Sequence, residues 1–324
     1  MKSPFKILSC FAGGAAILLG TSTSIATKRP APPVRSIQTT EIEMQVFLDR
    51  ADFSPGEIDG NSGRNSRKAL AAFQAAHGLA PGARNRKALL DALGAGAIKA
   101  IVPYTITVQD AAGPFTKTIP EDMIEKSKLP GLYYTSVLQE LGEKFHSAPA
   151  LLKRLNPRAR FTAGEQIQVP NVTGSKQEAV DSAQVRGGMI KVVVSRKASC
   201  LTVYDRKGEI IFYAPVTSGN NRNPLPIGNW EVTEVQRNPI YNYNPDLFWN
   251  ADPAGAKAQI AAGPNNPVGV VWIGINDPHY GIHGTPEPGR IGGSNSDGCV
   301  RMTNWDALRV AGMVTTGTRV VFEE

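Results

Sequence analysis

A thiol, an imidazole and a guanidinium occur close together in the last part of the sequence. Cys299 follows His283 by sixteen positions, and Arg301 comes two residues after the cysteine. The thiolate form of cysteine attacks carbonyl carbons, and a neighbouring imidazole can take up the thiol proton. On an extended segment, Arg301 would point to the same side as Cys299. There it can bind a substrate carboxylate or favour the thiolate, so the pattern predicts acyl transfer by a cysteine nucleophile.

Three other interpretations stay open on the residues alone. Cys299 could form a disulfide with Cys200 in an oxidising compartment. It could bind zinc together with His279 and His283, although the glycines and proline around these histidines argue against a shared helical face and no fourth ligand is obvious. Finally, Cys299 could be an inert buried thiol.

The composition excludes several classes of protein. Of the 324 residues, 41% are hydrophobic and 19% are charged; the formal net charge is +7 and there are three cysteines. These values exclude wholesale disorder, collagen, a multi-span membrane protein and a disulfide-dense scaffold. The mild positive charge suits an anionic polymer but is too small to argue for nucleic acid. The length predicts two or three domains.

The residues around the thiol are expected to be positioned by β-structure. Runs rich in β-branched and aromatic residues, separated by glycine, proline and asparagine, predict a mainly antiparallel sandwich or barrel over 189–323. Residues 205–208 are expected to form a hairpin turn in which Gly208 has positive φ. A helix is expected to start near Asn304, with Asp306 in its first turn. The predicted strands are 190–194, 200–204, 209–216, 229–235, 270–275 and 319–322.

Residues 189–323 resemble the L,D-transpeptidase catalytic domain of the YkuD family. That family's signature is His-Gly-Thr, a spacer of a dozen or so residues, and Ser/Thr-x-Gly-Cys with an arginine two positions on. Here it stands as residues 283–285, residues 296–299 and Arg301, and Asp297 occupies a place where many members carry histidine. The resemblance implies that the catalytic domain needs no metal or other cofactor.

The resemblance also implies a role for each residue of the predicted site. Cys299 would be the nucleophile and His283 the general base, then acid, with the Gly284 carbonyl orienting the imidazole. The amides of Gly298 and Cys299 would form the oxyanion site. Arg301 would bind a substrate carboxylate. Further contacts to the substrate or to these residues are expected from Tyr280, Ser296 and Asn304.

The activity implied is that of an exported L,D-transpeptidase acting on peptidoglycan stem peptides. A thioester acyl-enzyme would pass to the side-chain amine of another stem, which forms a 3→3 cross-link. Transfer to a protein lysine or to water (L,D-carboxypeptidase activity) shares the first half-reaction and stays open. The rival class is a non-catalytic wall-binding protein with an inactive last domain. The sequence does not predict an oligomeric state.

Residues 38–93 are predicted to form a small three-helix bundle. Ser66 is a candidate cap for the second helix, and Gly78 is placed to end it. The turn at 56–63, followed by the pattern at 66–74, resembles the peptidoglycan-binding domain of bacterial wall hydrolases. Peptidoglycan, both its stem peptides and its glycan, is therefore the expected partner.

Residues 101–172 are expected to contain a strand at 104–108, two helices and a strand within 164–170. Ser147 is a candidate cap for the second helix. This βααβ order resembles a LysM module, with an insertion at 110–133 between the first strand and the first helix. A degenerate module that serves as a spacer is the alternative. The whole chain is thus predicted to be a multi-domain α+β protein.

The first 26 residues are predicted to be a signal peptide. Lys2 and Lys6 precede a short apolar run, and small residues follow at 24–26. The run is too short for a membrane helix, so no membrane span is expected in the mature chain. Linkers are expected at 27–37 and 173–188. These features predict export to the periplasm or the cell wall.

Overall fold

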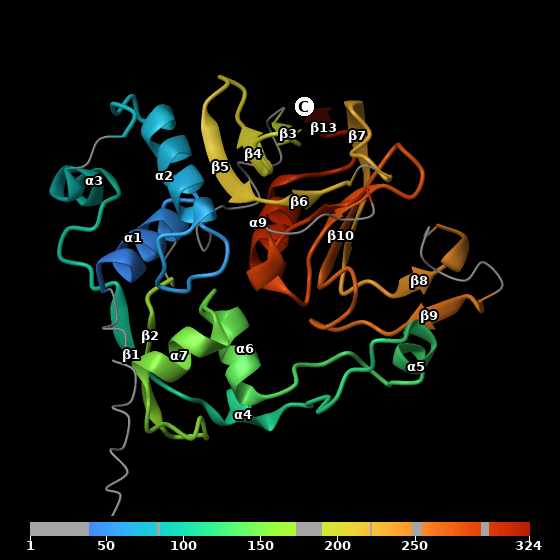
Figure 1. Ribbon diagram of the computed structural model, residues 1–324, viewed down its shortest axis with the longest axis horizontal. Helices are drawn as coiled ribbons and strands as arrows, with labels where there is room; N and C mark the ends of the chain where they lie inside the picture. The colour runs from blue at the N-terminus through green and yellow to red at the C-terminus, as the bar shows by residue number, and fades with distance from the viewer. Residues whose placement is uncertain (1–38, 83–84, 173–189, 221, 248–254, 293–297) are drawn as a thin grey trace, which may run out of the picture. The chain divides into compact units, whose positions relative to one another are not determined.

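The computed structural model describes residues 39–82, 85–172, 190–220, 222–247, 255–292 and 298–324 (Figure 1). Residues 37–324 form one compact unit. The predicted signal peptide (1–26), both predicted linkers (27–37 and 173–188) and Ser296 lie outside the described residues. Among the helices that are described, none combines the length and the apolar character needed to cross a membrane.

Three helices open the described chain, as the apolar spacing predicts. They are α1 (Thr39–Arg50), α2 (Arg64–Ala76) and α3 (Arg86–Ala92). Gly78 has φ +62° directly after the C-cap His77, which confirms its predicted place at the end of α2. The prediction that Ser66 caps this helix is wrong. Gly63 is the N-cap, and the Ser66 hydroxyl instead accepts a hydrogen bond from Gln45 Nε2 at 3.1 Å inside the fold.

The segment from 101 to 172 carries a two-stranded antiparallel sheet and four short helices. β1 (Ile101–Thr105) pairs with β2 (Gln166–Pro170) in a register running from Ile101↔Pro170 to Thr105↔Gln166. The first strand ends earlier than predicted because Thr107 caps α4 in a capping box with Asp110. The helices are α4 (Val108–Ala112), α5 (Met123–Ser127), α6 (Val137–Lys144) and α7 (Pro149–Leu155).

The predicted cap of α7 is also wrong. Ala148 is the N-cap and Pro149 occupies the first turn, where a missing N–H costs nothing. The Ser147 hydroxyl donates instead to the Ala148 carbonyl at 3.3 Å. The resemblance of this segment to a LysM module stays a prediction.

A nine-stranded sheet forms most of the region after residue 190, in the order β5-β4-β3-β13-β7-β10-β11-β12-β6. The β3–β13 and β11–β12 pairs are parallel and the other pairs are antiparallel. Every predicted strand is confirmed, whereas the short strands β6, β11 and β12 were not expected. The strands are β3 (Lys191–Ser195), β4 (Cys200–Tyr204), β5 (Ile210–Pro215), β6 (Thr217–Ser218), β7 (Gly228–Arg237), β10 (Val271–Ile275), β11 (Gly281–His283), β12 (Val300–Arg301) and β13 (Arg319–Glu323).

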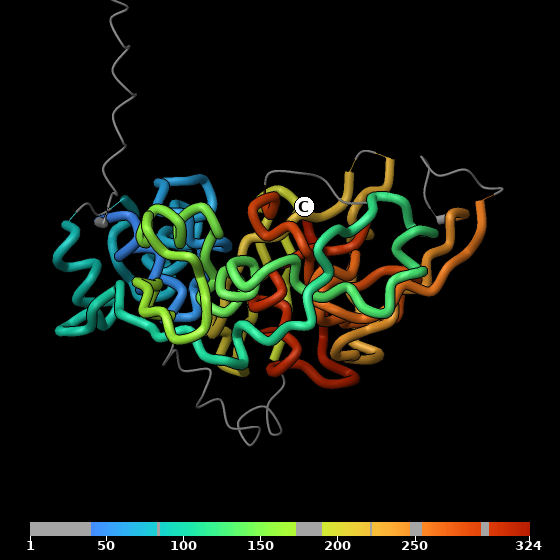
Figure 2. The backbone as a smooth tube through the Cα atoms, turned by 90° about the horizontal axis from the view of Figure 1, so that it is seen from below, coloured from blue at the N-terminus to red at the C-terminus, as the bar shows by residue number. Residues whose placement is uncertain are grey.

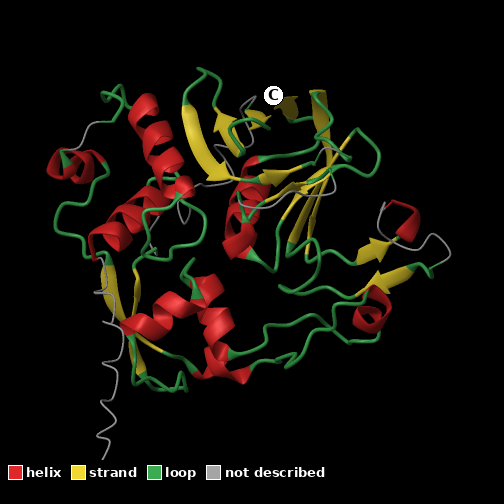
Figure 3. Cartoon of the chain, in the orientation of Figure 1, coloured by secondary structure: helices red, strands yellow, loops and turns green. Residues whose placement is uncertain are grey.

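Helix α9 (Asn304–Met313) packs against this sheet (Figure 3). It begins where predicted: Thr303 is the N-cap, and its hydroxyl accepts from the Asp306 amide at 3.2 Å. The hairpin between β4 and β5 is also confirmed, because Gly208 has φ +82°. Apolar side chains of α9 and of the strands together form the largest buried cluster.

A small outlying sheet pairs β8 (Tyr241–Tyr243) with β9 (Ala258–Ile260). Two 3₁₀ turns, η2 (Pro245–Leu247) and η3 (Pro288–Arg290), lie in the loops. Helix α5 packs against β9, and the two lie side by side in both views (Figure 1 and Figure 2). A segment inserted between β1 and α6 therefore reaches the region that follows residue 190.

Helix α1 has two buried faces. Phe47 and Leu48 pack in a cluster that also contains Tyr213 of β5, whereas Ile42 and Val46 pack with α6, α7 and β2. The three-helix segment therefore shares its core with both neighbouring segments. A helix that is apolar on both sides is one buried between other elements.

Candidate active site

Two adjacent strands bring the predicted nucleophile and base together. β11 ends at His283 and β12 starts at Val300, directly after Cys299. The strands are parallel, with Ile282 opposite Val300 and His283 opposite Arg301. Cys299 therefore lies one step before the paired residues, beside the start of β11. Both Cys299 and His283 line one cavity of about 820 Å³.

The imidazole of His283 is buried and held in one orientation. The residue is 4% exposed, and its Nδ1 lies 2.7 Å from the carbonyl oxygen of Gly284. Because a carbonyl only accepts, Nδ1 carries the proton and Nε2 is left as the basic nitrogen. The ring also stacks on Trp272 at a centroid distance of 5.7 Å.

Burial, together with the Arg301 guanidinium, lowers the pKa of His283 to about 3. The ring is therefore neutral at physiological pH, which is the form that can accept a proton from a thiol. The cation that lowers this pKa lies on the neighbouring strand, opposite His283 in the register.

Cys299 is half-buried, and its thiol is reduced, not joined in a disulfide with Cys200. The Sγ of Cys299 donates to the carbonyl oxygen of His279 at 3.5 Å. Cys200 is also a reduced thiol and lies in β4, where it packs in the cluster shared with α1 and α2. Within the described ranges, no group of three or more histidine, cysteine or acidic side chains is placed to hold a metal ion.

Two glycines permit close packing around this pair. Gly298 has φ +112°, and a Cβ there would lie 2.6 Å from the Tyr280 ring. At Gly284 a Cβ would collide with Oδ1 of Asn304. Side chains at these positions would thus displace the residues that flank the thiol and the imidazole. The roles of the Gly298 and Cys299 amides at an oxyanion stay predictions.

The remaining predicted residues fall into two groups. Arg301 and Tyr280 line the same cavity as Cys299. Asn304 is not among the residues that line it: it is 1% exposed at the start of α9, where Oδ1 accepts from the Val270 amide at 3.2 Å and Nδ2 donates to the Pro264 carbonyl at 3.1 Å. It supports the loop behind His283.

Two walls of the cavity come from outside the signature. Tyr241 and Tyr243 of β8 form one of them, and Met123 of α5 adds a side chain from the 110–133 insertion. Nothing in the motif pattern of the sequence indicated Met123 as a lining residue. The available signal was the insertion itself, since a long departure from a compact module calls for a structural reason.

Comparisons with known proteins agree with this geometry. Residues 190–322 match the YkuD model, described as the L,D-transpeptidase catalytic domain, and residues 42–82 match the model described as "Putative peptidoglycan binding domain". The Bacillus subtilis protein "Putative L,D-transpeptidase YkuD" is 28% identical over 185 residues, covering 56% of this chain and 91% of that protein. "Putative L,D-transpeptidase YqjB" from the same organism is 31% identical over 140 residues, covering 41% of this chain and 70% of that protein.

Among solved structures, an L,D-transpeptidase from Mycobacterium smegmatis is similar at 20% identity and a TM-score of 0.35. The match covers 43% of this chain and 60% of that one, so the chain spans about three fifths of that structure. This similarity is too low to support a functional conclusion. The sequence relatives and the catalytic-domain match do support one: the chain belongs to the L,D-transpeptidase family and is an acyltransferase of that kind.

Proposed function

We propose that this L,D-transpeptidase is exported and joins peptidoglycan stem peptides through a thioester on Cys299. The observation that carries the proposal is the placement of a reduced cysteine thiol and a neutral, oriented imidazole in one cavity. The match of residues 42–82 to a peptidoglycan-binding domain supports the same polymer as substrate.

In the first half-reaction, His283 Nε2 takes the proton of the Cys299 thiol. The thiolate attacks the carbonyl carbon on the L-centre of the third stem residue, and the amides of Gly298 and Cys299 stabilise the oxyanion. The C–N bond to the terminal D-residue then breaks. The leaving amine takes the proton from His283, and a thioester remains on the enzyme.

In the second half-reaction, an acceptor amine attacks the thioester and His283 accepts its proton. The amide forms as the C–S bond breaks, and the thiol is restored. We propose the side-chain amine of another stem as the acceptor, which gives a 3→3 cross-link. Arg301 lines the same cavity and supplies a fixed positive charge for a substrate carboxylate.

We also propose the domain division 38–93, 101–172 and 189–323. In this division the first part binds peptidoglycan, the second is a LysM-like module with an insertion, and the third carries a mainly antiparallel sheet and the chemistry. Export would place the mature chain in the periplasm or cell wall, and the proposed chemistry uses no cofactor.

Intact-mass spectrometry with a carbapenem, which is an acylating substrate mimic, tests the nucleophile. The wild-type chain and Cys200→Ala should each gain one drug mass, whereas Cys299→Ala should gain none. An adduct that persists on Cys299→Ala would overturn the assignment. Analysis of muropeptides after incubation with the enzyme then distinguishes cross-linked products from hydrolysed ones.

A further inference from the structure

A side chain of the region matched as peptidoglycan-binding contacts the connection between His283 and Cys299. Asn65, the second residue of α2, donates from Nδ2 to the Ile291 carbonyl at 2.9 Å. Ile291 directly follows η3, in the connection from β11, which ends at His283, to β12, which begins after Cys299. Helix α2 also packs against β5 (Figure 1). The two matched regions thus meet at the segment that joins the two residues of the proposed chemistry.

The contact is close on both sides of this hydrogen bond. Ile291 is 5% exposed, so little water can replace the Asn65 amide as the partner of its carbonyl. The next residue, Gly292, has φ +75°, and a Cβ there would lie 2.5 Å from Asn65 Oδ1. The Asn65 amide therefore packs directly against the Gly292 backbone, at a position where only glycine fits.

The same backbone is tied to the strand that begins beside Cys299. The Gly292 amide donates to Thr217 Oγ1 at 2.8 Å, and Thr217 is 2% exposed in β6. In the sheet, Thr217 lies opposite Arg301 of β12. β6 and β12 have two residues each, and β6 is the edge strand. Because so short an edge pair has few ladder hydrogen bonds of its own, contacts from outside the pair are important for its position.

We propose that Asn65 is a positioning residue for acyl transfer: by holding residues 291–292, it fixes Thr217 and, through the β6–β12 pair, the start of β12 where Cys299 lies. The line of contacts runs from Asn65 through residues 291–292 and Thr217 to β12, and each step is a hydrogen bond or a strand pairing. This role depends on the proposed role of Cys299 as the nucleophile. It gives the region matched as peptidoglycan-binding a share in the chemistry itself.

Acylation by a carbapenem tests this role in the full chain, because a small soluble acyl donor does not require binding to the polymer. Asn65→Ala removes the hydrogen-bond donor, and Asn65→Asp keeps the shape of the side chain but its carboxylate has no N–H to donate. We expect each variant to lower the limiting rate of acylation roughly 10-fold, less than the cost of about 100-fold for a 1 Å misplacement, since the strand pairing itself remains. The apparent dissociation constant of the drug should stay unchanged, because Asn65 is not among the residues that line the cavity of Cys299.

Asn61→Ala is the matched control. The Asn61 side chain is exposed and donates to Asp59 Oδ2 at 2.9 Å within its own turn, so its loss should leave the rate within about twofold of wild type. Rates are taken per folded molecule with a titratable thiol, so that a difference in stability does not count. Equal rates in Asn65→Ala and Asn61→Ala, or a loss confined to the dissociation constant, would overturn the proposal.

Thr217→Val tests the route from Asn65 to β12. Valine keeps the shape of threonine but cannot accept the Gly292 N–H. We expect it to lower the limiting rate, and we expect the double variant Asn65→Ala, Thr217→Val to lose less than the product of the two single losses, because both residues act on one line of contacts. A wild-type rate in Thr217→Val, or losses that simply multiply, would overturn the proposal. Absence of acylation in the wild-type chain would instead refute the proposed function.

Discussion

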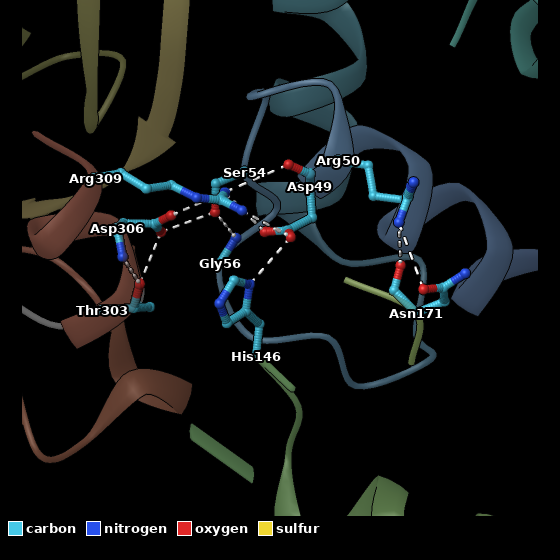
Figure 4. A network of polar contacts seen from close by, with 9 residues as sticks. All are labelled: Asp49, Arg50, Ser54, Gly56, His146, Asn171, Thr303, Asp306 and Arg309. Carbon is cyan, nitrogen blue, oxygen red and sulfur yellow. Dashed lines mark hydrogen bonds and ion pairs between the residues drawn. The ribbon is translucent and has the colours of Figure 1, made fainter. Parts of the chain in front are cut away.

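His283 and Asp49 are both buried titratable groups, but their surroundings differ: those of Asp49 stabilise the charged form, whereas those of His283 stabilise the neutral form. Around Asp49, charges are matched: Arg309 Nη1 and Nη2 each contact one carboxylate oxygen at 3.1 Å, and His146 Nδ1 lies 3.0 Å from Oδ2 (Figure 4). Around His283 there is one short hydrogen bond, to a neutral carbonyl, and a nearby cation, Arg301.

The two pKa values follow from these surroundings. Burial alone would raise the pKa of Asp49, but Arg309 and His146 outweigh it and hold this pKa well below its usual range. At His283, burial and Arg301 act in the same direction and lower the pKa to about 3. A buried charge that is paired supports the fold, whereas a buried base that is kept neutral is ready to take a proton.

The matched charges also join two segments of the chain. Asp49 belongs to α1, and Arg309 belongs to α9. Nearby, the Ser54 hydroxyl donates to Asp306 at 2.8 Å, and the Ser54 amide donates to the Tyr213 carbonyl at 2.8 Å. The region matched as peptidoglycan-binding is thus attached to the catalytic region by buried polar contacts as well as by shared apolar packing.

The largest expected effect is on the acylation rate when His283, the buried group without an opposite charge, is replaced. His283→Ala should slow acylation by about 10²- to 10⁴-fold, the usual contribution of a general base. The fold should persist, because no ion pair is lost. Stopped-flow acylation and thermal unfolding measure the two quantities.

The neighbouring histidine is the control for this variant. His279 is exposed, and it is its backbone carbonyl that contacts the thiol. His279→Ala should therefore acylate at close to the wild-type rate. Equal losses in the two variants would remove His283 from its proposed role.

At the buried ion pair, Asp49→Ala should reduce the free energy of unfolding by about 3–5 kcal/mol, the usual cost of breaking such a pair. The reason is that the buried Arg309 loses both contacts with the Asp49 carboxylate. Urea unfolding monitored by circular dichroism measures the change, and the acylation rate per folded molecule should be unaffected.

An exposed ion pair calibrates this prediction. Arg196 and Glu324 are joined at 2.6 Å with side chains 42% and 65% exposed, so Arg196→Ala should cost about 0.2–1 kcal/mol. The double variant Asp49→Leu, Arg309→Met should recover part of the loss caused by Asp49→Ala, because Arg309 is then no longer buried without Asp49. Recovery should be incomplete, because the buried Asp306 also loses Arg309, which lies 3.8 Å away, and keeps only its hydrogen bonds from Ser54 and Thr303. A loss of stability at position 49 no larger than that at position 196 would contradict the expected difference between buried and exposed ion pairs.

The smallest expected effect concerns the protonation of His283, which should not change between pH 7 and pH 5. Lowering the pH from 7 to 5 should leave the ring of His283 neutral, because its folded pKa is about 3. Proton NMR of the ring hydrogens, with only four histidines to assign, can follow this directly. An inflection near the ordinary histidine pKa of about 6.5 would contradict it.

The same shift has a consequence for stability. In the unfolded chain this histidine binds a proton below about pH 6.5, whereas in the folded chain it does so only below about 3. The unfolded state therefore holds more protons between these values. The contribution of His283 to the free energy of unfolding is therefore fully present above about pH 6.5, and it is lost as the pH falls toward 3.

The fold was predictable wherever a pattern extends over several residues. The six predicted strands follow from runs of β-branched residues, and Gly78 and Gly208 mark a helix end and a hairpin because both have positive φ. β11 and β12 were missed because they contain three and two residues, too few for any periodicity. Yet these two strands position His283 and Cys299, so the predicted chemistry rests on a sequence motif and not on recognised secondary-structure elements.

What the sequence could not predict depends on contacts between distant segments. No motif or spacing singles out His146, but its ring contacts Asp49 and stacks on Trp305 at 5.0 Å. Ser66 has the chemistry of a cap, but Gln45 binds its hydroxyl. No local pattern encodes a partner that lies tens or hundreds of residues away.

The 110–133 insertion bears on how this enzyme could be inhibited selectively. Its helix α5 adds Met123 to the lining of the cavity that holds Cys299, yet this residue lies outside the stretch matched as the catalytic domain. A compound that bonds to the Cys299 sulfur and extends to the Met123 thioether would contact a side chain that the proposed chemistry does not require. Drug selectivity would then come from the 110–133 insertion, which the proposed reaction itself does not use.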